Sequence, residues 1–113
     1  MNRSRVTGNL ASHGNIFVDI ANDRVGIGST IPAQKLSLPD SAKIALGNSA
    51  DFQLYHNGSN SYVDHQGSGN LFIRGNGTNN VHLRAKIGES SVKCVPDGAV
   101  EIYFDNTKRL ETV

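Results

Sequence analysis

The stretch at residues 52–65, FQLYHNGSNSYVDH, decides the fold that this sequence predicts. Two runs of alternating residues flank the step Asn57-Gly58, and Asn-Gly between such runs is the strongest short-range signal for a β-hairpin. Closing the turn at Gly58 and Ser59 fixes the register of the two strands. The predicted cross-strand pairs are His56–Ser61, Tyr55–Tyr62, Leu54–Val63 and Phe52–His65.

This register gives the predicted hairpin two different faces, because side chains alternate along a strand. Phe52, Leu54 and Val63 share one face, which we expect to be buried. Tyr55 and Tyr62 lie opposite each other on the second face, where aromatic cross-strand pairs stabilise a sheet.

The rest of the chain repeats the same kind of pattern. Short runs of alternating residues end at Gly, Asn or Asp about every ten residues, and helical periodicity is nearly absent, which indicates an all-β fold. The segment TIPAQK could form at most a helical turn. The expected strands cover residues 15–20, 24–28, 35–38, 42–46, 51–56, 61–65, 70–74, 80–87, 91–95, 99–104 and 109–113.

A second hairpin is predicted at residues 91–104, SVKCVPDGAVEIYF. A three-residue loop with Gly98 in the left-handed conformation, as in a type I turn with a G1 bulge, pairs apolar with apolar residues and Lys with Glu. The expected pairs are Val95–Ala99, Cys94–Val100, Lys93–Glu101 and Val92–Ile102.

Two apolar positions in each strand are too few for one chain of 113 residues to bury a large core. Stacking against symmetry-related copies would complete the core. We therefore expect an elongated repeat of short strands and hairpins, as an intertwined homotrimeric fibre, triple β-helix or β-prism. Its shared core would contain Ile44, Leu46, Phe52, Leu54, Leu71, Ile73, Val100, Ile102 and Phe104.

Charge and composition argue against several classes of function. The net charge is +1 and the basic residues are scattered, which disfavours nucleic-acid binding. The single cysteine, Cys94, excludes an intrachain disulfide and a zinc site built on cysteine pairs. No apolar leader or membrane-length segment is present, so we expect a soluble protein without membrane insertion or a classical export signal. Residues 1–22 are expected to be an attachment or linker segment, and residues 23–113 a β-rich fibre domain.

Catalytic and cofactor sites are not predicted. His13, His56, His65 and His82 are widely spaced, so they favour surface or strand-end roles, although copies of one histidine around a trimer axis could bind a metal. No nucleophile elbow or phosphate-binding loop occurs, since GIGST lacks the required pattern. The sequence therefore predicts no enzyme, no catalytic residue, no cofactor and no metal site.

Asparagine and tyrosine residues offer the best candidate for binding. The triplets at Asn2, Asn57 and Asn76 match glycosylation acceptors, but Asn-Gly favours turns at the last two. Tyrosine rings stack on sugars, and Tyr103 shares this chemistry. We expect a glycan or receptor contact at Tyr55, Tyr62, Asn57 and Asn60, with a purely structural tyrosine pair as the alternative.

Three blocks of the sequence resemble bacteriophage tail-fibre and appendage proteins, especially those of phages that infect marine bacteria. They are VGIGSTIPAQKL at residues 25–36, LYHNGSNSYV at 54–63 and GAVEIYFDNTKRLETV at 98–113. They occur in the order usual for that family, and the similar region runs from about residue 23 to 113.

The resemblance implies a long homotrimeric fibre located in the virion and assembled in the host cytoplasm. The expected function is structural, contributing to host-surface recognition, with other tail or appendage proteins and a host-surface glycan as partners. Two alternatives stay open at this point. The chain could be a stand-alone carbohydrate-binding β module, or a bacterial surface filament or adhesin repeat.

Overall fold

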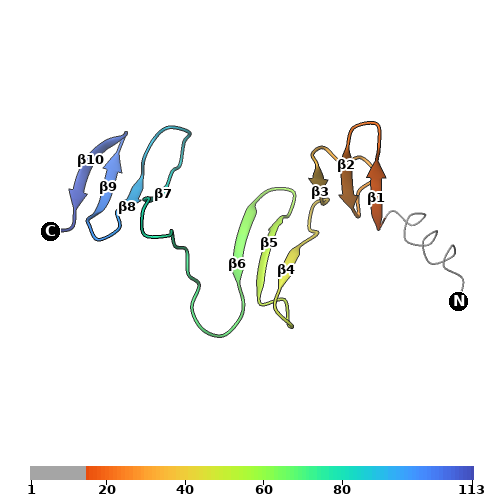
Figure 1. Cartoon of the computed structure of the whole chain (residues 1–113), viewed down its shortest axis with the longest axis horizontal. Helices are drawn as coiled ribbons and strands as arrows, with labels where there is room; N and C mark the ends of the chain where they lie inside the picture. The colour runs from red at the N-terminus through yellow and green to blue at the C-terminus, as the bar shows by residue number, and fades with distance from the viewer. Residues whose placement is uncertain (1–14) are drawn as a thin grey trace, which may run out of the picture. The chain divides into compact units, whose positions relative to one another are not determined.

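The computed structural model describes residues 15–113, which are all-β with ten strands and no helix (Figure 1). The chain divides into two compact units, of which the first ends at Gly69 and the second begins at Asn70. The strands are β1 (Ile16–Asp19), β2 (Arg24–Ile27), β3 (Leu36–Ser37), β4 (Ile44–Leu46), β5 (Phe52–His56), β6 (Ser61–His65), β7 (Val81–Leu83), β8 (Val92–Cys94), β9 (Val100–Phe104) and β10 (Thr107–Glu111).

The first sheet has the order β1-β2-β3, in which β1 and β2 are antiparallel and β3 is parallel to β2. Gly26 is essential to it, because a Cβ there would lie 2.0 Å from the carbonyl oxygen of Ser29. The pairing of β1 with β2 crosses the boundary expected after residue 22, so residues 16–22 belong to the same hairpin as β2. An attachment role for residues 1–22 stays a prediction.

The second sheet has the order β4-β5-β6 and contains the hairpin that the sequence predicts. All four expected pairs of β5 and β6 are present, and the all-β expectation is confirmed with them. Gly58 adopts a φ of 96°, which explains why a glycine follows Asn57 in this turn. Strand β4 adds to the other side of β5, where Ile44 pairs with Leu54 and Leu46 with Phe52.

The third sheet has the order β10-β9-β8-β7 and forms the second compact unit. The expected pairing of β8 with β9 is confirmed, including Lys93 opposite Glu101. The predicted turn is wrong in detail, because Asp97, not Gly98, has the left-handed conformation, with a φ of 52°. The amide of Gly98 donates to the carbonyl of Val95 at 3.1 Å. Pro96 followed by a residue with positive φ is the arrangement of a type II turn.

Residues 70–74 are not a strand, so the prediction of eleven strands is wrong at this position. Their sequence, NLFIR, has the composition of a strand, but a strand also needs a neighbour with which to form hydrogen bonds. In Figure 1 the chain between β6 and β7 runs without an arrow. Other boundaries also differ, since β4 begins at Ile44, β7 covers only Val81–Leu83 and the last strand covers Thr107–Glu111.

Large hydrophobic side chains are not buried anywhere in residues 15–113 of the single chain. All nine residues expected in a shared core remain partly or largely exposed. None of the three sheets closes on itself or stacks as a solenoid in this part of the chain. The fold therefore consists of open sheets, each of which leaves an apolar face uncovered.

Candidate functional site

The predicted binding residues lie on the aromatic face of the second sheet. The rings of Tyr55 and Tyr62 are stacked, with centroids 4.7 Å apart and an interplanar angle of 17°. Their positions follow from the register, which places the two residues directly opposite each other on β5 and β6. On the other side of Tyr55, Lys43 places its ammonium nitrogen 4.4 Å from the ring centroid. This contact is a cation–π interaction.

The two predicted asparagines join this aromatic face from the turn. Asn57 Oδ1 accepts hydrogen bonds from the amides of Ser59 and Asn60, at 3.0 and 2.8 Å. The side-chain amides of Asn57 and Asn60 donate to the hydroxyl of Tyr62, at 3.3 and 3.5 Å. The structure thus brings all four predicted residues together, and it confirms that Asn57 acts as a turn residue.

The two tyrosines differ in how much of each ring a ligand could reach. Tyr55 is enclosed by Tyr62 from β6 and by Lys43 from the β4 side, and burial, with Asp64 and Tyr62 nearby, raises the pKa of its hydroxyl. Tyr62 lies on the outer strand of its sheet within the described residues, and 37% of its surface is exposed. The outer face of the Tyr62 ring is therefore the part of this site that can stack on a sugar.

Lys43 is a part of the site that the sequence prediction missed. It precedes β4 by one residue, and the pairing of Ile44 with Leu54 places it beside Tyr55. The signal was available in the sequence, since alternation in AKIAL puts Lys43 and Ala45 on the face opposite Ile44 and Leu46. Finding it required the pairing of β4 with β5, which local patterns do not specify.

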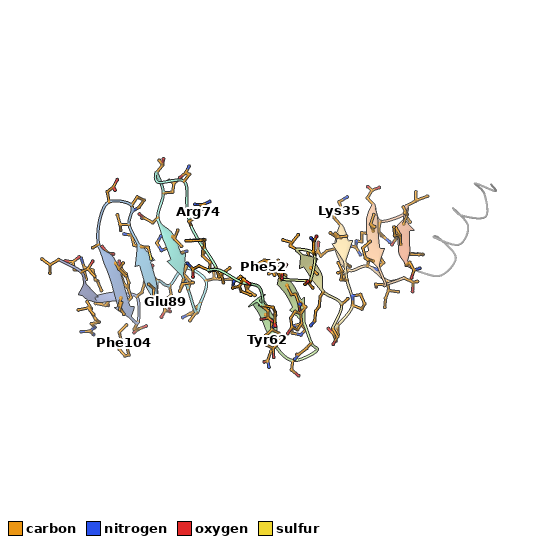
Figure 2. All side chains as sticks on the ribbon, turned by 90° about the horizontal axis from the view of Figure 1, so that it is seen from below. Lys35, Phe52, Tyr62, Arg74, Glu89 and Phe104 are labelled. Atoms are coloured by element: carbon orange, nitrogen blue, oxygen red, sulfur yellow. The ribbon has the colours of Figure 1, made fainter. Side chains whose placement is uncertain are left out.

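The opposite face of the second sheet is apolar and uncovered (Figure 2, where Phe52 labels this face and Tyr62 the aromatic one). Ile44, Leu54 and Val63 form one row across the three strands, because each pairs with the next. They are 45%, 37% and 62% exposed. Such a contiguous apolar row is typical of a surface that another protein covers.

The third sheet has the same division into two faces. Its apolar row is longer and runs across four strands, from Leu83 through Val92 and Ile102 to Leu110. A bulge between Lys108 and Leu110 keeps Leu110 on the same face as Ile102. Ile102 and Leu110 are 44% and 61% exposed.

The polar face of the third sheet carries a network of charged groups. Lys93 Nζ lies 3.6 Å from Glu101 Oε2, and Lys108 Nζ lies 2.7 Å from Glu111 Oε2. The hydroxyl of Tyr103 donates to Glu101. This hydrogen bond, with Lys93 and Lys108 nearby, lowers the pKa of the Glu101 carboxyl. The same hydrogen bond raises the pKa of the Tyr103 hydroxyl. Tyr103 is thus engaged in a structural network and does not join the tyrosine pair of the second sheet.

The histidines in the described part of the chain have separate environments. His56 Nδ1 lies 2.9 Å from Ser61 Oγ, and His65 Nε2 lies 3.1 Å from the carbonyl of Gly69. Residues 15–113 contain no group of three or more side chains that could hold a metal ion. His13 and Asn2 lie outside the described residues. The absence of an enzyme, cofactor or metal site stays a prediction.

Asn76, the third asparagine of the glycosylation-like triplets, also forms a turn. Its side-chain oxygen accepts a hydrogen bond from the amide of Thr78 at 3.0 Å. The two triplets in the described residues therefore have a local structural explanation.

Comparisons with known proteins give no match to a family model, a curated protein or a solved structure. No helix within residues 15–113 is long and apolar enough to cross a bilayer. The functional argument therefore depends on the surfaces described above.

Proposed function

We propose that the chain is a structural segment of a phage tail fibre or another virion appendage, in which copies of the chain assemble as a homotrimer. The observation that supports this proposal is the apolar face left open on every sheet. In the first sheet it carries Ile16, Val18, Val25, Ile27 and Leu36; the other two sheets carry the rows already described. The three sequence blocks that resemble tail-fibre proteins support the virion assignment.

The energetic argument for assembly is the cost of leaving these faces in water. Full burial of one aliphatic side chain contributes about 1.5–3 kcal/mol. Each sheet offers several such side chains on one face, and the polar faces of the second and third sheets are already engaged in stacking and ion pairs. Neighbouring copies would thus pack their apolar faces together and leave the polar faces toward solvent.

The test is the mass of the full-length chain in solution, measured by sedimentation equilibrium. A mass three times the 12.1 kDa of one chain is expected, and a mass of one chain would overturn the proposal. A matched pair of variants locates the interface on the second sheet. Leu54→Lys introduces a charge on the apolar face and should dissociate the trimer, whereas Ala45→Lys, at an exposed position on the opposite face, should leave it intact.

The virion assignment requires its own test. Neighbouring genes that encode phage tail components are expected, and mass spectrometry of the purified virion should detect the chain. A bacterial surface filament or adhesin is the alternative, and a neighbourhood of cell-surface genes without phage structural genes would favour it.

A second candidate function, glycan binding in host recognition, is favoured by the open ring face of Tyr62. Asn57 and Asn60 lie beside the hydroxyl of Tyr62 and could bind sugar hydroxyls. A glycan array with the wild type, Tyr62→Ala and Tyr103→Ala tests this function. Loss of a signal with the first variant only is expected, and equal binding by all three proteins would reject the site. A monomeric chain that still bound glycan through Tyr62 would favour the stand-alone module.

A further inference from the structure

Residues 70–74 have the character of a strand without a partner. Leu71, Phe72 and Ile73 are 42%, 72% and 69% exposed, which is unusual for three consecutive large hydrophobic residues. Among the described residues, no backbone–backbone hydrogen bond is found for residues 70–80 outside the strands. A segment of this composition gains most from a neighbouring strand that pairs with its amides and carbonyls.

The segment already presents two distinct faces. The guanidinium carbon of Arg74 lies 5.9 Å from the ring centroid of Phe72, so these two side chains lie on one side of the chain. In an extended chain, Leu71 and Ile73 then point to the other side. The segment therefore has an aliphatic side and an aromatic, cationic side.

Strand β6 offers an edge of matching length and character. It is the outer strand of the sheet β4-β5-β6, has five residues and contains neither a bulge nor a proline. Its apolar face shows Val63, and its other face shows Tyr62 and Asp64. Of the other outer strands, β3, β4 and β7 have only two or three residues and β1 has four, while β10 contains a bulge and several charged residues.

The first residues after β6 continue along the start of β5. The amides of Gln66 and Gly67 both donate to the carbonyl of Asp51, at 2.7 and 3.0 Å. Gly67 is packed so tightly there that a Cβ would lie 2.8 Å from Cβ of Asp51. Gln66 and Gly67 are therefore held at the start of β5, and β5 is the strand that pairs with β6 within the described residues.

We propose that residues 70–74 form a strand by adding to the β6 edge of a neighbouring copy of this chain, with Ile73 opposite Val63. This inference rests on the proposed assembly and identifies the segment that would link its copies. Ile73 would extend the apolar row of Ile44, Leu54 and Val63 to four strands, the number that the sheet β7–β10 has within one chain.

The complementarity of the other faces favours this partner. A parallel addition would place Phe72 opposite Tyr62 and Arg74 opposite Asp64, and an antiparallel addition would make the same pairs diagonal neighbours on one face. In either case the added strand would cover the outer ring face of Tyr62, so glycan stacking on that ring requires a chain whose β6 edge is free. An aromatic pair and an opposite-charge pair each stabilise neighbouring strands. Exchange of such a segment between copies is a common way to build oligomers.

Hydrogen exchange of the full-length wild-type protein, resolved by residue, tests the pairing. Alternate amides between Leu71 and Arg74 should exchange about 100-fold more slowly than in an unpaired chain, and the amide of Gly77, in a loop, serves as the reference. Fast exchange of all these amides in a protein that sedimentation shows to be a trimer would overturn this inference and leave the proposed function intact. A monomer would instead overturn the proposed assembly.

Disulfide trapping tests the choice of β6. Two chains with different tags, both carrying Cys94→Ser, are refolded together, one with Val63→Cys and the other with Ile73→Cys. A disulfide between the two tags is expected on mild oxidation, because directly opposed residues have Cβ atoms about 4.5–5.5 Å apart. The control replaces Ile73→Cys by Thr78→Cys. Protection without a specific Val63–Ile73 crosslink would reject the β6 edge.

Discussion

The sheets β4–β6 and β7–β10 share a plan and differ in the chemistry of their polar faces. Both leave a row of aliphatic side chains uncovered on one face. The polar face of β4–β6 is held by a stack of Lys43, Tyr55 and Tyr62, whereas that of β7–β10 is held by ion pairs around Glu101. The difference teaches that the apolar faces are the feature common to the two sheets, while the chemistry of the polar faces varies.

The largest expected effect comes from a charge in the apolar row of β7–β10. In the proposed assembly, Ile102→Lys would bury an unpaired ammonium at the centre of this row, at a cost on the order of 3–5 kcal/mol. We expect dissociation to single chains in sedimentation, as for Leu54→Lys. Ile102→Leu, which keeps the volume, should remain assembled. If Ile102→Lys stays assembled while Leu54→Lys does not, the two sheets do not play the same role.

The two hairpin turns give the next largest effect. Gly58 has a φ of 96°, so Gly58→Ala should destabilise the protein by about 1–2 kcal/mol. Asp97 has a φ of 52°, near the left-handed region that Asp and Asn tolerate, so Asp97→Asn should stay within about 0.5 kcal/mol of the wild type. Denaturant unfolding at one fixed chain concentration measures both variants. Equal losses of unfolding free energy in the two variants would mean that the two turns do not differ in backbone strain.

The sequence predicted these two hairpins well because their information is local. Alternating residues and the Asn-Gly step are enough to pair Tyr55 with Tyr62, and matching apolar and charged residues are enough to pair Lys93 with Glu101. The turn at 96–98 was mispredicted because glycine was expected to take the left-handed position, whereas Asp97 takes it after Pro96.

The sequence alone does not show which distant segments of the chain pair with each other. Residues 70–74 have strand composition, yet a strand exists only where another backbone pairs with it. The contact of Lys43 with Tyr55 was not predicted for the same reason, because it depends on the pairing of β4 with β5. Residue types were enough to predict the candidate site. Identifying its accessible part, the outer face of Tyr62, required the order of the strands in the sheet.

Removal of the tyrosine stack should have a moderate effect. Tyr62→Ala loses the ring stacked on Tyr55, and we expect the melting temperature to fall by roughly 3–8 °C. Tyr62→Phe keeps the stack and loses only the hydroxyl that accepts hydrogen bonds from Asn57 and Asn60, so its melting temperature should fall less. Circular dichroism at one chain concentration measures both. A larger fall in melting temperature for Tyr62→Phe than for Tyr62→Ala would show that the hydrogen bonds, not the rings, stabilise this face.

The smallest expected effect is a dependence of the melting temperature on pH. It distinguishes the polar face of β7–β10 from that of β4–β6. The hydrogen bond from Tyr103, with Lys93 and Lys108 nearby, lowers the pKa of Glu101 below its ordinary value of 4.5. A carboxyl with a lowered pKa stabilises the folded state above the ordinary pKa, and this contribution disappears as the pH falls through the lowered value. Melting temperatures measured from pH 6 downward should therefore decline less steeply in Glu101→Gln than in the wild type, while Tyr62→Phe should follow the wild-type profile.

High salt should also weaken the wild-type ion pairs, because Lys93 and Lys108 remain within reach of the solvent. Identical profiles for Glu101→Gln and the wild type would show that the ion pairs do not stabilise the folded sheet β7–β10.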